Sequence, residues 1–560
     1  MADMAMFCSK CGYELKKDKK AENKRKYKFD EKSIKIIVVS CCICIGIALL
    51  VYFSMFHMQN ADWSIKCDDT TGRWYISEYK GKDKCVEVPC TLKKGWFEHD
   101  VAEIGNSAFS GCSNLNSIKI PDSVTRIGNN AFSECRSLSS IEIPDSVTRI
   151  GTGAFSGCSS LSSIEIPNSV MEIGNTAFSG CSSLSSIEIP DSVTWVEDNT
   201  SSEDGVLPAE YMPLPASVER VRFGIFSGCR SLSSIEIPDG VTEISSDAFS
   251  GCKSLSSIEM PDSVMWISDN AFSGCKSLSS IEIPDGMIDI GDNAFSGCSN
   301  LSGIEIPDSV TRIGRGAFSG CSSLSSIEIP NGVEGIWSSE FSGCSNLSSI
   351  EIPDSVMWIG TDAFSGCSSL SSIEIPDGVT EISSGAFSGC SSLSSIKIPD
   401  GVTEIGYGTF LGCSSLNSVL MSENVVSIGN SAFENCSSLN RIGISPGVKD
   451  IGSSAFKGCS SLTEIVLFPL VEEIGSQAFS GCSNLVSVDI RGAVNRMTIR
   501  NGAFEDCISL SSIDLSSISS SSLIESCAFS GCSSLTTVIV PSNIELDGSE
   551  FDENCSVIRQ

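Results

Sequence analysis

A phrase of 23 residues recurs along most of this chain, and no other feature constrains its fold as strongly. One copy, residues 138–160, reads LSSIEIPDSVTRIGTGAFSGCSS. Its cysteine returns every 23 residues almost throughout, with a longer step between Cys181 and Cys229 and two steps of 25 after Cys482. Such a period is the signature of stacked repeats. We therefore predict one continuous solenoid rather than several globular domains.

Each unit divides into a strand and a turn-rich return. In the quoted copy, residues 138–143 (LSSIEI) alternate at their end and stop at Pro144, which is typical of a strand with Ile141 and Ile143 on one face. Glycines supply turns in the return. One copy cannot bury its apolar side chains alone, whereas stacked copies merge them into one core. The other recurring apolar positions of this copy are Val147, Ile150, Ala154, Phe155 and Cys158.

The pattern resembles the BspA-like leucine-rich repeats, whose units read LxxIxIPxxVxxIGxxAFxxCxxL. The resemblance covers residues 104–560, in which eighteen cysteines follow Phe by three positions and Phe551 is one place out of step. It implies a curved, β-rich solenoid with a parallel sheet on its concave side and short turns or helical turns on its convex side. It also implies display on a cell surface, often as an adhesin or host-binding protein, without naming a ligand.

Residues 1–35 are built differently from the repeats. Cys8 and Cys11, in MFCSKCGYEL, form a knuckle that resembles one half of a zinc ribbon, and a basic linker follows it. A structural zinc ion takes four ligands, so zinc at Cys8 and Cys11 would need ligands from a second chain. The alternative is a knuckle that holds no metal.

Residues 36–56 carry no charge over 21 positions, a length that spans a bilayer core. Lys and Arg gather before this run, so the positive-inside rule places the N-terminus in the cytoplasm and the repeats outside. A cleaved signal peptide is disfavoured because 35 residues precede the run and no A-x-A site ends it. We predict a single transmembrane helix in the cell membrane.

Residues 57–103 lie between this predicted helix and the repeats. Two short alternating runs around a GKD sequence predict a hairpin that caps the first repeat, because an uncapped solenoid would expose its core. Cys67, Cys85 and Cys90 lie here. In an oxidising extracellular compartment two of them could form a disulfide.

Glutamate recurs at the exposed strand position, which we predict to line the concave side. Stacked strands lie about 4.8 Å apart, so neighbouring carboxylates would repel by somewhat under ~1 kcal/mol in water. This stripe is either a solvated face that opposes sheet association or a surface for cations or a basic partner. Lys119 and Lys397 occupy the same register at its ends. The column comprises Glu142, Glu165, Glu188, Glu236, Glu259, Glu282, Glu305, Glu328, Glu351 and Glu374.

Two further features are candidates for recognition. Trp195, Trp266 and Trp358 share a register that carries Arg or Glu in other units, so we interpret it as exposed. The three tryptophans are either contact residues or scattered aromatics, because they are not on adjacent units. An irregular insert at residues 197–215 is predicted to protrude as a loop, and such loops often carry recognition; a degenerate repeat fits the insert equally well.

The nineteen repeat cysteines hold one register beside Phe. Free Cys is among the most buried residue types, so we predict a ladder of buried thiols. Disulfides between stacked neighbours are the alternative.

Composition and residue placement argue against nucleic-acid binding and catalysis. The net charge is −32, which leaves no basic surface for phosphates. His57 and His99 are the only histidines, and both precede the repeats, so no repeat serine or cysteine has a histidine base within the array. We predict no enzymatic activity, no small-molecule substrate and no cofactor for the repeats.

Together these features predict a membrane-anchored, surface-displayed repeat protein that mediates protein–protein binding or adhesion with an extracellular or host protein. Two alternatives stay open. One is a passive spacer about 90 Å long by strand spacing, and the other is an intracellular interaction scaffold.

Overall fold

The computed structural model describes residues 62–94, 97–190, 192–193, 219–494, 496–546, 548–552 and 555–560. The knuckle at Cys8 and Cys11, the predicted transmembrane helix at residues 36–56, Trp195 and the predicted insert at residues 197–215 lie outside these ranges. Trp63–Gln560 forms one compact unit. Within the described ranges, no helix has the length and hydrophobicity needed to cross a bilayer.

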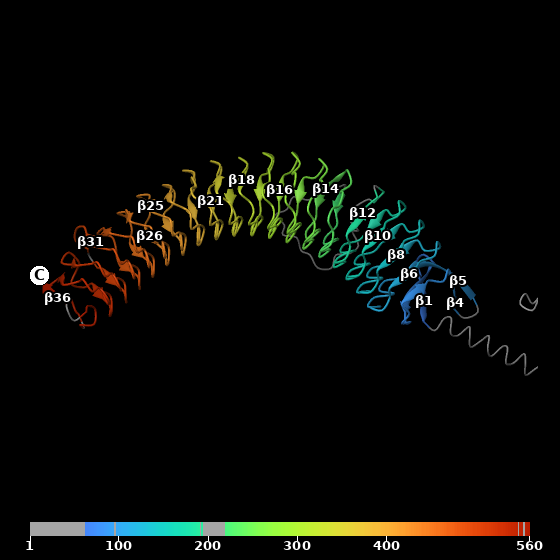
Figure 1. Ribbon diagram of the computed structural model, residues 1–560, viewed down its shortest axis with the longest axis horizontal. Coiled ribbons are helices and arrows are strands. Elements are labelled where there is room, and N and C mark those ends of the chain that lie inside the picture. The colour runs from blue at the N-terminus through green and yellow to red at the C-terminus, as the bar shows by residue number, and fades with distance from the viewer. Residues whose placement is uncertain are drawn as a thin grey trace, which may run out of the picture. The chain divides into compact units, whose positions relative to one another are not determined.

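The repeats stack as successive rungs, and each rung contributes up to two short strands to two separate lines (Figure 1). Pairing between rungs is parallel and keeps equivalent residues opposite each other, as for Ile327 with Ile350 and Ile267 with Ile290. We predicted one parallel sheet with turns or helical turns behind it. The described residues contain turns but no helix, and the second line was not expected because its strands are mostly only two residues long.

The first line holds the predicted strands. Between β12 and β18 it continues as isolated parallel bridges, such as Glu282 with Glu305. It comprises β3 (Cys85–Glu87), β6 (Ser117–Lys119), β8 (Ser140–Glu142), β10 (Ser163–Glu165), β12 (Ser186–Glu188), β18 (Ser326–Glu328), β20 (Ser349–Glu351), β23 (Ser395–Lys397), β25 (Ser418–Leu420), β27 (Arg441–Ile442), β29 (Glu464–Leu467), β31 (Ser487–Ile490), β33 (Ser512–Asp514), β35 (Thr537–Val540) and β36 (Ser556–Arg559).

The second line follows the Pro-containing turn of each unit and usually ends on a buried isoleucine. It comprises β7 (Arg126–Ile127), β9 (Arg149–Ile150), β11 (Glu172–Ile173), β13 (Glu219–Val221), β14 (Val241–Ile244), β15 (Trp266–Ile267), β16 (Asp289–Ile290), β17 (Arg312–Ile313), β19 (Gly335–Ile336), β21 (Trp358–Ile359), β22 (Glu381–Ile382), β24 (Glu404–Ile405), β26 (Ser427–Ile428), β28 (Asp450–Ile451), β30 (Glu473–Ile474), β32 (Thr498–Ile499) and β34 (Leu523–Ile524).

An antiparallel segment precedes the first regular rung, as an atypical end unit should. Strand β1 (Trp63–Cys67) pairs with β2 (Trp74–Tyr79), and β4 (Thr91–Lys94) pairs with β5 (Phe97–Ile104). The predicted hairpin around GKD is therefore wrong, because β2 pairs with β1 and β5 whereas β3 pairs with β6. The β1–β2 turn instead forms at Asp68, where hydrogen bonds from Thr70 and Thr71 lower the pKa of the carboxyl to about 2.

A stack of phenylalanine rings runs through the core, with one ring from each rung. Ring centroids of consecutive residues from Phe109 to Phe551 lie 5.1–5.9 Å apart. The stack passes from Phe178 to Phe226, so the rungs before and after the irregular step are direct neighbours. These rings are almost completely buried along the array and give the rungs one shared core.

Each core cysteine ties its rung to the preceding one. The Sγ of Cys344 donates a hydrogen bond to the carbonyl oxygen of Phe318 at 3.2 Å, and the same oxygen accepts the backbone N–H of Cys321 at 3.0 Å. The seventeen repeat cysteines from Cys135 to Cys532 are buried free thiols, whereas Cys112 and Cys555 at the two ends of the ladder are half-buried. The predicted thiol ladder is confirmed, and burial raises the pKa of thiols such as Cys298 to about 12.

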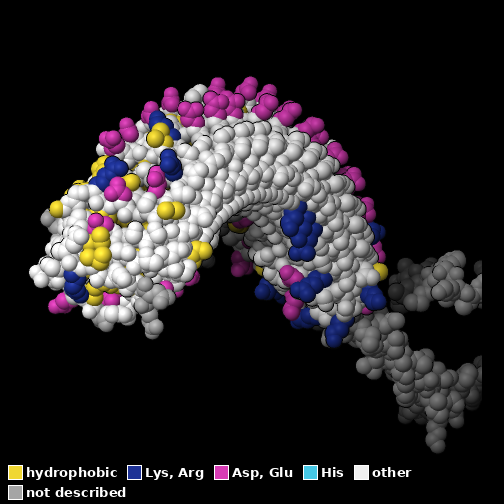
Figure 2. All heavy atoms as spheres, turned by 60° about the vertical axis from the view of Figure 1, so that its left-hand side comes forward, with side chains coloured by type: hydrophobic (Ala, Val, Ile, Leu, Met, Phe, Trp, Pro, Cys, Tyr) yellow, Lys and Arg dark blue, Asp and Glu magenta, His cyan; other side chains and the backbone are white. Residues whose placement is uncertain are grey.

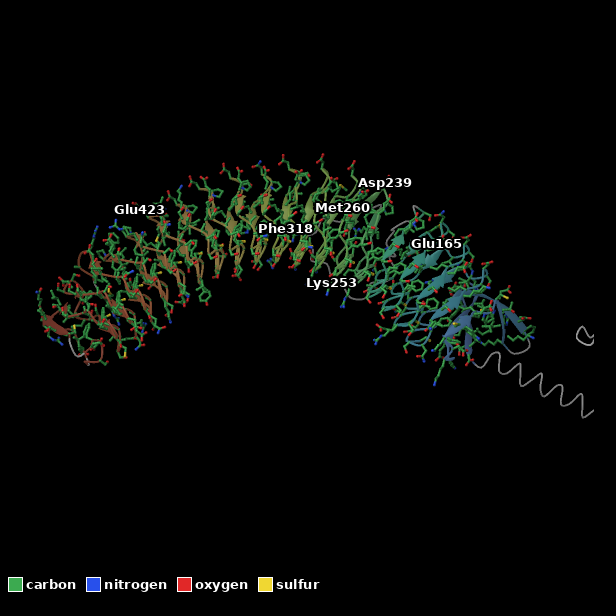
Figure 3. All side chains as sticks on the ribbon, in the orientation of Figure 1. Glu165, Asp239, Lys253, Met260, Phe318 and Glu423 are labelled. Carbon is green, nitrogen blue, oxygen red and sulfur yellow. The ribbon has the colours of Figure 1, made fainter. Side chains whose placement is uncertain are left out.

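The strands that carry the glutamates do not line the inner edge of the stacked array. The prediction that the glutamates line the concave side is therefore wrong. Figure 3 places Asp239 and Glu423, in turns that follow the first line, at the outer edge, and Lys253 at the inner edge. Near Lys253, Gly251 has φ of 73°, and an added Cβ would lie 3.7 Å from the Cα of Gly228. The distance is an ordinary van der Waals contact, so glycine is favoured in this turn by its positive φ rather than by lack of space.

The rung that contains Trp337 and Glu340 departs from the repeat pattern at several positions that contact each other. At the consensus glycine before the turn, the backbone N–H normally bonds the isoleucine carbonyl of the previous rung, as Gly314 does with Ile290. Trp337 replaces that glycine, and its N–H bonds the Oε2 of Glu340 at 2.7 Å instead. Glu340 stands where most rungs have a core alanine. It is 0% exposed, and its Oε1 has no partner.

Replacing Glu340 by Gln should stabilise the protein at neutral pH by about 1–3 kcal/mol, because Gln keeps an acceptor for Trp337 and removes a carboxyl group that must either stay charged in the core or take up a proton on folding. Burial raises the pKa of Glu340 above its usual 4.5. The free-energy cost of burying the Glu340 carboxyl is therefore absent below pH 4.5 and grows as pH rises toward the folded-state pKa. Denaturant unfolding across pH measures this gain.

The exposed Glu334 of the same rung is the matched control. Glu334→Gln should change the unfolding midpoint little at any pH. An equal gain in both variants, or a gain for Glu340→Gln that does not fade in acid, would contradict the assignment.

Candidate protein-binding groove

The glutamate column forms a continuous row on the first line of strands. All ten predicted glutamates are exposed, and strand pairing sets them side by side, as for Glu165 with Glu188 and Glu328 with Glu351. Each directly follows a buried isoleucine. The structure confirms that these glutamates are exposed and brings them together in a row, although not on the concave side.

A second row of carboxylates runs beside the first, and the sequence analysis missed it. It is formed by the aspartate that follows the proline of most units, three residues after the glutamate, and it is exposed at Asp285, Asp308, Asp354 and Asp377, with Asn331 in its place after Glu328. The repeated IPD sequence has the same 23-residue period as the glutamates. That period could have identified the second row.

The two rows line one open groove over successive rungs, here called the acidic groove. Between the rows, Ile283 and Ile306 remain partly exposed against the core. An apolar floor with carboxylate rims suits Lys or Arg side chains, which bury an aliphatic stem and keep the charged head in water. The groove is lined by Glu282, Asp285, Glu305, Asp308, Glu328, Glu351, Asp354, Glu374, Asp377 and Lys397, with intervening isoleucines, prolines and small residues.

A lysine of the chain itself occupies one end of the groove. The Nζ of Lys397 lies 2.7 Å from Oδ1 of Asp377. The hydrogen bond to Asp377, followed by the charges of Asp377, Asp400 and Glu374, raises the pKa of Lys397. At the other end of the register, the Nζ of Lys119 lies 3.2 Å from Oε1 of Glu87 on β3. Lys397 shows that an ammonium group fits against the aspartate row.

Acidic side chains dominate the outer rim of the repeat unit in Figure 2, whereas Lys and Arg appear on the inner surface. The remaining carboxylates include some that face cations on the second line. There, Arg312 contacts Asp289 at 3.0 Å and Asp292 at 2.9 Å. Burial raises the pKa of Asp289 despite Arg312. The acidic groove is thus the surface on which exposed carboxylates lie in parallel rows.

The tryptophan register is not an exposed surface. Trp266 on β15 and Trp358 on β21 are half-buried, and β15 and β21 are separated by β16, β17 and β19, so the structure does not bring the two residues together. The indole of Trp358 covers Gly335 of the preceding rung, where a Cβ would collide with it. It also meets Trp337 edge-on at 5.7 Å. Trp337 was missed because it stands at a glycine position.

The described residues form neither the predicted disulfide nor a cluster of metal ligands. Cys67 is half-buried, Cys85 and Cys90 are exposed, and all three are free thiols, so the disulfide prediction is not supported. In the described ranges, no cluster of three His, Cys, Asp or Glu residues is arranged to hold a metal ion. His99 stacks on Trp74 at 3.9 Å.

The stacked parallel rungs, the leucine and isoleucine core and the exposed strand face define a leucine-rich repeat solenoid. The model of the BspA type leucine-rich repeat region matches residues 83–204, 208–324, 289–410, 335–463, 380–497 and 449–559. The chain belongs to this family.

Several solved structures are similar to this chain. A leucine-rich repeat protein from Bacteroides ovatus is 27% identical over 89% of this chain and 97% of that chain, with a TM-score of 0.44. A leucine-rich cell surface protein from Faecalibacterium prausnitzii is 26% identical over 78% and 94%, with a TM-score of 0.36. The pneumococcal vaccine antigen PcpA is 17% identical over 89% and 96%, with a TM-score of 0.25. A search of curated protein sequences returned no match.

Proposed function

We propose that this chain is a membrane-anchored, surface-displayed protein that binds a cationic segment of a partner protein in the acidic groove. The observation that carries the proposal is Lys397, whose ammonium group is held by Asp377 at the end of the groove. A partner's lysines or arginines would take equivalent positions beside Asp285, Asp308 and Asp354, which form no ion pair with other described residues.

The groove favours an extended partner over a single charge. Equivalent carboxylates recur at every rung, about 4.8 Å apart, so one exposed ion pair contributes little but several along the groove add up. Each bound cation would also relieve repulsion between neighbouring carboxylates. Binding should therefore weaken as salt rises. A passive spacer has no specific ligand, so it should not show salt-dependent binding that is confined to one surface.

The anchoring part of the proposal depends on the sequence. The uncharged run at residues 36–56, with basic residues before it, supports a membrane helix with the repeats outside. The groove would then face extracellular or host proteins. An intracellular scaffold would instead keep the same groove in the cytoplasm, and the location of the repeats separates the two possibilities.

Removing charge from the groove should weaken binding of a fluorescent peptide of alternating lysine and serine. In the full-length chain, held in uncharged detergent, Glu305, Glu328 and Glu351 would all be changed to Gln. Losing three ion pairs of roughly 0.5 kcal/mol each should lower the affinity about tenfold at low salt. Fluorescence anisotropy measures the change.

The matched control carries Gln at Glu334, Glu381 and Glu404, which are exposed glutamates on the second-line side of their rungs. It changes the net charge by the same amount and should bind almost as the unchanged protein does. Equal weakening in both triple variants would mean that the peptide responds to net charge, and the groove would not be the site.

Labelling of thiols on intact cells tests the location of the repeats. The exposed Cys85, Cys90 and Cys527 should react with a membrane-impermeant maleimide. Core thiols such as Cys298, whose pKa is raised by burial to about 12, should react only after unfolding. Mass spectrometry identifies the labelled peptides. Labelling of the three exposed thiols only after permeabilisation would contradict an extracellular array.

A further inference from the structure

A column of serines follows the repeat cysteines and continues across most rungs. Each hydroxyl donates to the carbonyl oxygen of the equivalent residue in the previous rung, as Ser345 does to Ser322 at 3.4 Å and Ser368 does to Ser345 at 3.2 Å. Similar bonds are made by Ser182, Ser322, Ser391, Ser414, Ser437 and Ser460. Serine here serves the stacking of the array and leaves the column uncharged.

Three consecutive rungs replace this serine by a cation: Arg230, Lys253 and Lys276, here called the basic triad. Backbone bonds from Ser254 to Arg230 and from Ser277 to Lys253 show that the three rungs are direct neighbours. All three side chains are exposed, and the described residues provide no ion-pair partner for them.

Arg136 occupies the same column, but its charge is neutralised by a carboxylate of its own rung. Its Nη2 lies 2.9 Å from Oε2 of Glu134 within the same turn. In the units of the basic triad, glycine stands where Glu134 does, at Gly228, Gly251 and Gly274, and glycine has no side chain that could neutralise the cation. Their charges are therefore not matched inside the rung.

The basic triad and the carboxylate rows face different edges of the repeat unit. Figure 3 labels Lys253 at the inner edge and Asp239 at the outer edge, with Phe318 of the core between the two edges. Figure 2 likewise shows Lys and Arg side chains on the inner surface, apart from the acidic rim. A contact between triad and groove can therefore form between two molecules without any rearrangement of one rung.

We propose that the basic triad docks into the acidic groove of a second copy of this chain. Both surfaces are built by the same repeat, so the cations of one copy and the carboxylates of the other recur with the same rung spacing of about 4.8 Å. Two arrays that nest, with the inner edge of one against the outer edge of the other, can thus pair three cations with three rungs at once. The inference rests on the proposed function, because it requires the groove to accept cationic side chains.

The contact joins unlike surfaces, so it is heterologous. Each bound copy still presents a free triad or a free groove, and such contacts extend into open assemblies unless the geometry closes a ring. Because the pairs are exposed, the assembly should form at low salt and disperse as salt rises. The expected product on a membrane is a lateral row of arrays.

Sedimentation velocity of the full-length chain in uncharged detergent tests this contact with two variants. The triad variant carries Arg230→Ser, Lys253→Ser and Lys276→Ser, which restores the residue that the column has elsewhere and so preserves the fold. The groove variant carries Glu305→Gln, Glu328→Gln and Glu351→Gln. The unchanged protein should form salt-sensitive oligomers, and each variant alone should remain monomeric.

An equimolar mixture of the two variants gives the sharpest result. One variant retains an intact groove and the other an intact triad, so the mixture should form one-to-one complexes and nothing larger. Oligomers that persist in either variant alone, a mixture that stays monomeric, or an unchanged protein that is monomeric at low salt would overturn the inference.

Peptide binding separates this failure from failure of the proposed function. The triad variant should bind the lysine–serine peptide as the unchanged protein does. If it does so but the oligomers are unaffected by either set of changes, the groove binds cations and only the contact between copies is wrong. If the groove variant also binds the peptide normally, the proposed function fails as well.

Discussion

Contact between successive rungs is the interaction on which the rest of this structure depends. A single unit is too small to enclose its own leucine, isoleucine and phenylalanine side chains, so each rung is covered by its neighbours. The phenylalanine stack and the thiol–carbonyl bonds act together in this contact. The oxygen of Phe318 accepts one hydrogen bond from its own turn and one from the thiol of the next rung. Cysteine therefore combines an apolar volume with a donor that the buried carbonyl can use.

The same stacking turns single residues into extended surfaces. A glutamate or aspartate on one rung is an ordinary exposed charge, but parallel pairing repeats it at a fixed spacing and produces the acidic groove. Replacement of serine on three adjacent rungs likewise produces the basic triad. A binding surface in such an array consists of one repeat position on several successive rungs, because neighbouring copies of that position are close in space although they are 23 residues apart in sequence.

Much of this arrangement follows from the sequence. The period predicts the solenoid, the alternation in LSSIEI predicts the first-line strands, and one repeated glutamate predicts the acidic row. The aspartate row was missed because it lies in a turn, although it has the same period. The second line was missed because two residues such as Arg312 and Ile313 show no alternation. Curvature depends on how closely rungs approach at each edge, and a pattern of single units does not reveal that.

Departures from the repeat were harder to interpret than the repeat itself. Gly335, Trp337 and Glu340 each break the consensus, yet Gly335 leaves room for the indole of Trp358 and Glu340 receives the N–H of Trp337. Such compensation depends on contacts between rungs. Contacts between rungs also explain why the register of Trp266 and Trp358 was interpreted as exposed. Arg and Glu occur at this register in other units, but their long side chains lie along the neighbouring rung, as Arg312 does against Asp289.

Hydrogen exchange on the full-length Phe318→Ala variant tests the dependence on stacking most directly. Nearest-neighbour coupling predicts that backbone protection falls in the altered rung and in the two rungs that contact it, around Phe295 and Phe341, while rungs near Phe132 and Phe479 keep theirs. Loss of protection confined to the altered rung, or no loss at all, would contradict an array held together by contact between rungs.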